Sequence, residues 1–293
     1  MKRINQFYYI PLLFLLSFCS NRSNVDMIKT ISLNIRYENA SDSLNQWPER
    51  APIICNMIKN EIPDVFGLQE VLYSQYVYLD SILEKYGSAG VGRNDGVRDG
   101  EMNPVFYLKD RFDMIRNKTF WLSETPEKPG SVSWESSLPR IVTWMELSEK
   151  KSHEHFFVFN THFANDSEPA RIMSSRLLLS KIDSISSGFP FIVTGDFNML
   201  HSSKSYELLT GPFESVPLLS DTYTVSEKHH TGPAYTFNGF SDKPSGGRID
   251  YIFVRNGLKV LESRTLIRKE HGIFISDHWP VMAVVSLKMP KKK

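Results

Sequence analysis

Carboxylate, amide and imidazole side chains recur along this chain, each directly after a short apolar run. No hydroxyl or thiol nucleophile is placed among them. This combination is typical of a site that binds a hard divalent cation and activates a water molecule for hydrolysis. The side chains concerned are those of Asn34, Glu70, His162, Asp196, Asn198, Asp250, Asp277 and His278.

Taken singly, each of these residues has a plainer explanation. Glu70 could cap the next helix, and Asp196 could form an Asx-turn. His162 and His278 could be ordinary structural histidines, while Asp250 could lie on an edge strand. Their shared position argues for one site, because polar residues at strand ends converge into one crevice in layered α/β folds.

Strands and helices must bring these residues together. Strands are expected over residues 28–35, 64–69, 105–108, 114–122, 141–147, 155–161, 191–194, 249–254, 258–267 and 281–287. Helices are expected from Pro48, over 76–86 and from Ser167, where a capping residue precedes Glu-Pro. The glycine-rich stretch 87–100 predicts a surface loop. This order predicts an α/β domain in which two mixed sheets lie face to face with helices outside.

Composition limits the classes of function. Among the 293 residues, 34 Lys and Arg balance 33 Asp and Glu, for a formal net charge of +1. A broad basic surface for nucleic acid is therefore not expected, and phosphate would have to be bound locally. Two cysteines, Cys19 and Cys55, are too few for a disulfide framework or a cysteine-rich zinc site.

The N-terminus has the pattern of an export signal. Lys2 and Arg3 precede an apolar run over residues 7–18, which is too short to span a membrane. Cys19 then resembles the lipidated cysteine of a bacterial lipoprotein, although Phe18 is larger than that pattern prefers. We predict a signal peptide over 1–18, a tether over 19–26, a domain over 27–288 and a basic tail over 289–293. Ordinary secretory cleavage and an uncleaved anchor remain the alternatives.

Six blocks of sequence resemble the endonuclease/exonuclease/phosphatase superfamily. They are Ser-Leu-Asn-Ile-Arg at 32–36, Gly-Leu-Gln-Glu at 67–70, Asn-Thr-His at 160–162, Gly-Asp-Phe-Asn at 195–198, Arg-Ile-Asp-Tyr at 248–251 and Ser-Asp-His-Trp-Pro at 276–280. All six occur in the family's order and span nearly the whole domain. The resemblance implies a four-layered α/β/β/α sandwich like that of deoxyribonuclease I.

The resemblance also implies a role for each residue. Glu70 would bind Mg²⁺ or Mn²⁺, with Asn34 and Asp277 close to the metal or its waters. Asp196 would deprotonate the attacking water, which Asn198 would help to position. His162 and His278 would donate hydrogen bonds to phosphate oxygens, and Asp250 would orient His278. The implied reaction is in-line hydrolysis of a phosphoester without a covalent intermediate.

The substrate stays open at this point. The chain lacks the block typical of inositol phosphatases, and it shows no apolar hairpin of the kind expected in a secreted sphingomyelinase. Arg36, Arg93, Arg140 and Arg171 are candidates for binding a phosphate or polar substrate, and Arg36 is expected on the strand face of Asn34. The alternatives are a nuclease acting on DNA or RNA, which the net charge does not favour, and a non-catalytic lipoprotein. We expect a monomer at the cell envelope, held by a lipid if Cys19 is modified, or a secreted one.

Overall fold

The computed structural model describes residues 27–213, 216–244 and 246–287. The signal peptide, the tether with Cys19 and the basic tail lie outside these residues, so those expectations stay predictions. No helix within the described ranges is both long and apolar enough to cross a membrane.

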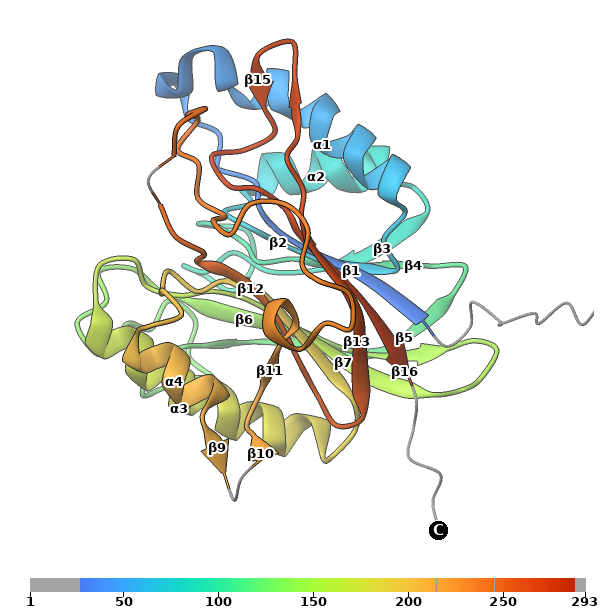
Figure 1. Cartoon of the computed structure of the whole chain (residues 1–293). Coiled ribbons are helices and arrows are strands. Elements are labelled where there is room, and N and C mark those ends of the chain that lie inside the picture. Colours follow the sequence, from blue (N-terminus) through green and yellow to red (C-terminus); the bar gives the residue numbers. More distant parts are fainter. Residues whose placement is uncertain (1–26, 214–215, 245, 288–293) are drawn as a thin grey trace, which may run out of the picture.

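Two six-stranded sheets form the centre of the molecule (Figure 1). The first sheet has the order β13-β16-β1-β2-β4-β3, in which only the β1 and β2 pair is parallel. Its strands are β1 (Met27–Asn34), β2 (Val65–Gln69), β3 (Tyr86–Ala89), β4 (Val105–Leu108), β13 (Leu258–Thr265) and β16 (Val281–Leu287).

The second sheet has the order β11-β12-β8-β7-β6-β5, in which only β7 and β8 run parallel. Its strands are β5 (Phe112–Trp121), β6 (Ile141–Glu149), β7 (His155–His162), β8 (Phe191–Asp196), β11 (Ser220–Asp221) and β12 (Asp250–Arg255). The predicted pair of mixed sheets is therefore confirmed.

Helices cover the outer face of each sheet (Figure 1). Helices α1 (Trp47–Glu61) and α2 (Tyr73–Ile82) pack on the first sheet, while α3 (Glu168–Ser186) and α4 (Lys204–Thr210) pack on the second. Pro48 lies in the first turn of α1, and the Ser167 hydroxyl caps α3 by accepting from the Ala170 amide at 3.1 Å. The remaining elements are η2 (Ala40–Asn45), α5 (Thr222–Val225), β9 (Pro212–Phe213), β10 (Val216–Pro217), β14 (Lys269–Glu270) and β15 (Ile273–Phe274).

Three apolar layers hold these four layers of secondary structure together. One lies between α1, α2 and the first sheet, and another between α3, α4 and the second sheet. The third lies between the sheets and is built from the inward side chains of their central strands, including Val65, Val158, Ile192 and Val285. The four-layered sandwich that the resemblance implied is thus the observed fold.

Two local expectations were wrong. The stretch 87–100 is not entirely loop, because residues 86–89 form strand β3 on the edge of the first sheet. The second helix ends at Ile82 rather than near 86, since Tyr86 already pairs with Leu108. Helix α4 was not predicted, because its seven residues are too few to show a clear helical period.

Candidate active site

Four strands from the two sheets end at the same edge of the sandwich. Asn34 ends β1 and Gln69 ends β2, while His162 and Asp196 end β7 and β8 as directly paired neighbours. Asp250 begins β12 opposite Asp196. The fold therefore brings together residues that lie up to 216 positions apart in the chain, from 34 to 250.

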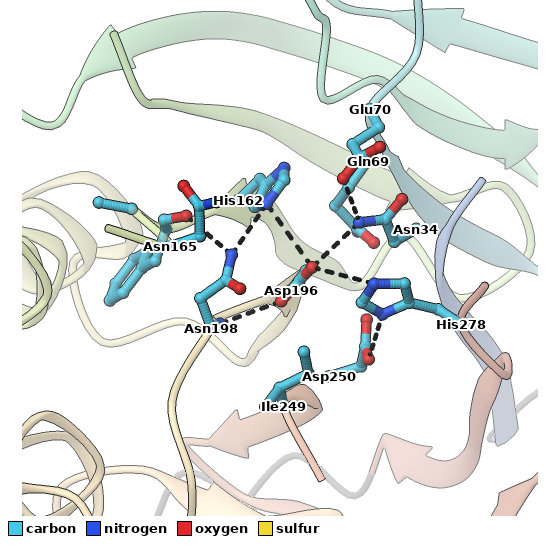
Figure 2. A network of polar contacts seen from close by, with 12 residues as sticks. Asn34, Gln69, Glu70, His162, Asn165, Asp196, Asn198, Ile249, Asp250 and His278 are labelled. Carbon is cyan, nitrogen blue, oxygen red and sulfur yellow. Dashed lines mark hydrogen bonds and ion pairs between the residues drawn. The ribbon is translucent and has the colours of Figure 1, made fainter. Parts of the chain in front are cut away.

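Asp196 lies at the centre of the resulting network (Figure 2). Its Oδ2 accepts from Asn34 Nδ2 at 3.0 Å, and its Oδ1 accepts from the Asn198 amide at 3.0 Å. The Nε2 atoms of His162 and His278 lie 3.6 Å and 3.7 Å from Oδ2. Burial and the negative charge of Asp250 raise the pKa of Asp196 to about 7. A carboxylate with this pKa suits a general base near neutral pH.

Three residues of the site have left-handed backbone conformations. The φ angles are 57° at Arg36, 59° at Glu70 and 48° at Asn198, each just past the end of a strand. Non-glycine residues rarely adopt this region, and such strain concentrates at functional sites. In each case the turn directs a polar side chain into the cleft between the strand ends.

Asp250 and His278 form a buried pair. His278 Nδ1 lies 2.8 Å from Asp250 Oδ2, and both residues are almost inaccessible to solvent. Burial alone would lower the pKa of His278, but the negative charges of Asp250 and Asp196 outweigh it and raise the pKa well above the usual value. The ring is therefore an imidazolium whose Nε2–H faces Asp196 and the cleft.

His162 has the opposite protonation state. Burial and the positive charges of Arg140 and Arg93 lower its pKa well below the usual value, so the ring is neutral. Asn198 Nδ2 donates to the Phe163 carbonyl at 3.1 Å and lies 3.0 Å from His162 Nε2, which must then accept. The proton accordingly lies on Nδ1, which is buried and faces Glu101 Oε2 at 3.9 Å.

The divalent cation that the resemblance implied would need oxygen ligands in the cleft. Glu70 and Asp277 both line the cleft, and burial together with the charge of Glu70 raises the pKa of Asp277. Two carboxylates that repel one another in a cleft are the oxygen ligands that Mg²⁺ favours. Asn34 Nδ2 donates to Glu70 Oε1 at 2.9 Å as well as to Asp196, so its amide links the two carboxylates. The residues therefore fit the cation.

A second group of ligand-type atoms lies nearby. Atoms of Asp196, Asp250 and His278 lie within 4.8 Å of one another. This trio fits a metal less well, because His278 is cationic and its Nδ1 is already occupied by Asp250. Glu70 and Asp277 therefore fit a cation better than this trio does.

The four predicted arginines differ in position. Arg36 and Arg140 line a cleft of about 610 Å³ above the network, and Arg93 lies behind it in contact with Glu101 at 2.8 Å. Arg36 pairs with Asp42 through two hydrogen bonds of 3.1 Å. The structure does not bring Arg171 to the cleft, because its guanidinium holds Glu168 and the Ala164 carbonyl at the start of α3.

Arg140 lines the cleft with part of its guanidinium unpaired. One of its nitrogens donates to Asn165 Oδ1 at 2.9 Å. Among the described residues, its Nε and Nη1 and the Nδ1 of His162 are buried without a hydrogen-bond partner. Unpaired buried donors are costly, and these nitrogens belong to residues that line the cleft.

Sequence reasoning missed several residues of the cleft wall. Glu101, Leu138, Asn165 and Phe237 line it, and Phe237 packs edge-on against His278 with ring centroids 5.1 Å apart. None follows a strand of the network directly. The available signals were their positions in the sequence. Glu101 directly follows the glycine-rich stretch 87–100, and Asn165 comes three residues after His162.

The family model for the endonuclease/exonuclease/phosphatase family matches residues 31–278, and this chain belongs to that family of phosphoester hydrolases. A family member from Bacteroides vulgatus is 37% identical, with a TM-score of 0.84 over 89% of this chain and 99% of that one.

Two further proteins that are similar to this chain carry specific names. The structure of a mannosyl-6-phosphatase from Bacteroides thetaiotaomicron is 32% identical, with a TM-score of 0.80 over 88% of this chain and 99% of that one. Nocturnin from Xenopus laevis is 28% identical over 65% of this chain and half of its own length.

Proposed function

We propose that this protein is a divalent-metal-dependent hydrolase in which Asp196 activates water for attack on a small phosphoester. The observation that carries the proposal is the arrangement around Asp196, whose Oδ2 accepts from Asn34 at 3.0 Å and lies 3.6 Å and 3.7 Å from the Nε2 atoms of His162 and His278. This arrangement separates an acid, a base and a phosphate anchor into different residues.

Each side chain has a definite part in the proposed reaction. Asp196 accepts the proton of the water, and Asn198 and Asn34 hold its carboxylate in place. His278 donates from Nε2 as negative charge grows on the phosphoryl oxygens, and Asp250 keeps that ring oriented and charged. Arg140, which lines the cleft, supplies the positive charge that anchors the phosphate.

Glu70 and Asp277 would hold the cation. When bound, a divalent cation supplies charge neutralisation and polarisation of the phosphoryl group. Without it, the cleft would place two carboxylates against an anionic substrate, which is unfavourable.

We favour a phosphomonoester as the substrate. The likeness to a mannosyl-6-phosphatase supports this, because it extends over nearly the whole of both chains. The net charge of +1 offers no broad surface for a polyanion, which makes nucleic acid the less favoured substrate.

The proposal is tested by hydrolysis of p-nitrophenyl phosphate and bis(p-nitrophenyl) phosphate with Mg²⁺ or Mn²⁺. We expect turnover that a chelator abolishes and added metal restores, with the monoester preferred. Absence of turnover with any divalent cation would show that the fold serves binding rather than catalysis.

A further inference from the structure

A buried arginine lies near the carboxylates of the cleft without lining it. Arg50 is on α1, in the helical layer over the first sheet (Figure 1), and it is 0% exposed. Burial lowers the pKa of Arg50 to about 10, while the charge of Asp277 opposes that shift, so the guanidinium stays cationic at neutral pH. A buried charge is costly, so its presence in the core calls for an explanation.

The main-chain oxygens that Arg50 binds belong to two segments of the proposed metal site. Its Nη1 donates to the Ile35 carbonyl, and its Nη2 donates to the Arg36 carbonyl at 3.1 Å, both just past the end of β1. Its Nη1 also reaches the Ile275 carbonyl at 3.5 Å, two residues before Asp277. One guanidinium therefore bridges the turn after β1 and the segment that leads to a metal carboxylate.

The turn after β1 is strained and holds Glu70. Arg36 has a φ angle of 57°, a left-handed conformation that persists only where the surroundings fix it. Gln75 Nε2 donates to the same Arg36 carbonyl at 3.2 Å. The next amide in the chain, that of Tyr37, donates to Glu70 Oε2 at 3.2 Å. By holding the turn, Arg50 fixes the direction of a donor that orients Glu70.

Further contacts lock the guanidinium itself. Its Nε donates to the Asn45 carbonyl at 2.6 Å. The guanidinium carbon lies 5.8 Å and 5.9 Å from the ring centroids of Trp47 and Phe240. A planar guanidinium presents several donors in fixed directions, whereas the single nitrogen of a lysine cannot replace them. The bridge between the segments therefore depends on the shape of Arg50 as well as on its charge.

We infer that Arg50 is a positioning residue for the divalent cation, because it sets the spacing between the turn that holds Glu70 and the segment that carries Asp277. The inference rests on the proposed function, in which these two carboxylates hold the cation. Mg²⁺ demands nearly ideal coordination geometry, so a shift of either carboxylate weakens its binding. Helix α1 thereby serves the metal site although it contributes no ligand.

The test measures the binding of Mn²⁺ to the unaltered protein and to Arg50→Lys, without substrate, from the electron paramagnetic resonance signal of free Mn²⁺. We expect Arg50→Lys to raise the dissociation constant at least about tenfold, as loss of a residue that supports metal ligands commonly does. Most of the turnover lost at low Mn²⁺ should return at saturating Mn²⁺. A general loss of structure would instead lower turnover at every Mn²⁺ concentration.

Arg111→Lys is the matched control. Arg111 donates to the Met27 carbonyl at 2.7 Å and pairs with Asp64 at 2.7 Å, so it joins the starts of β1 and β2 as Arg50 joins segments near their ends. We expect this control to lower the melting temperature without changing the dissociation constant for Mn²⁺. If Arg50→Lys does not fold, Gln75→Met removes the other side-chain donor to the Arg36 carbonyl and should raise that constant severalfold.

The outcomes separate the inference from the proposed function. An unchanged dissociation constant in folded Arg50→Lys or in Gln75→Met would overturn the inference, as would an equal rise in Arg111→Lys. In either case the proposed function would stand. Absence of Mn²⁺ binding to the unaltered protein would instead refute the proposed function.

Discussion

Replacing Asp250 with Asn removes the negative charge beside His278 while keeping the size and shape of the side chain. The carboxylate lies 2.8 Å from His278 Nδ1 and directly across the strands from Asp196. With the ring and carboxylate charges about 4 Å apart, their attraction is roughly 4 kcal/mol at an effective dielectric constant of about 20. Losing this attraction should lower the pKa of His278, because the charge of Asp250 is the largest of those that raise it.

The same substitution acts on Asp196 in the same direction. Asp250 raises the pKa of Asp196 by repulsion, so its removal should lower that pKa as well. The proposed reaction requires Asp196 ionised and His278 protonated, so both limbs of the profile of kcat/KM against pH should move to lower pH. At pH 8 turnover should fall by roughly a hundredfold or more, as loss of one oriented donor commonly causes.

The assay is the pH profile of p-nitrophenyl phosphate hydrolysis, with the pKa of His278 followed by NMR. Asp113→Asn is the control, because Asp113 is exposed at the start of β5, pairs with Lys150 and does not line the cleft. A profile that moves to higher pH, or a pKa of His278 that does not fall, would refute the assignment of this pair.

Three further substitutions probe other parts of the account. Asn34→Ala should reduce kcat at least about tenfold, because Glu70 and Asp196 lose their shared donor, and unchanged kcat would contradict that role. Arg140→Ala should raise KM for phosphomonoesters more than it lowers kcat, which steady-state kinetics can separate. Gly67→Ala should lower the melting temperature by several degrees, because the new Cβ would lie 2.2 Å from the Thr194 hydroxyl between the sheets; an unchanged melting temperature would contradict this.

The residues at strand ends could be predicted because two local signals coincide there. An apolar run that stops at a polar residue marks both the strand and its end, and Asn34, His162 and Asp196 all occupy such positions. The placement of those strands in two facing sheets then follows from the need to cover every apolar face.

Arg36 was correctly predicted to lie near Asn34 at the cleft, but the reason given for its position was wrong. Strand alternation predicted that it shares a face with Asn34, but β1 ends at Asn34 and the chain turns into the left-handed region. Arg36 reaches the cleft through that turn. Arg171 was placed wrongly because a helix start offers its own carboxylate and carbonyl, which bind the guanidinium locally.

The cleft wall could not be predicted from sequence. Glu101 faces the cleft because Trp121 and Gly92 fix its loop, and those contacts depend on how β5 is placed in the second sheet. Phe237 lies next to His278 because the two residues form an isolated antiparallel β-bridge, although they are 41 residues apart in the sequence. Likewise, the opposite protonation states of the two histidines depend on which charges surround each buried ring.

The most direct test of the central claim is hydrolysis of p-nitrophenyl phosphate in isotopically labelled water by the unaltered protein and by Asp196→Asn, with Mg²⁺ or Mn²⁺ present. We predict that the unaltered protein places the label in the released phosphate and that Asp196→Asn lowers the rate by roughly a hundredfold or more while still binding Mn²⁺. Label in the released alcohol, or an unchanged rate in Asp196→Asn, would contradict the claim that Asp196 activates the attacking water.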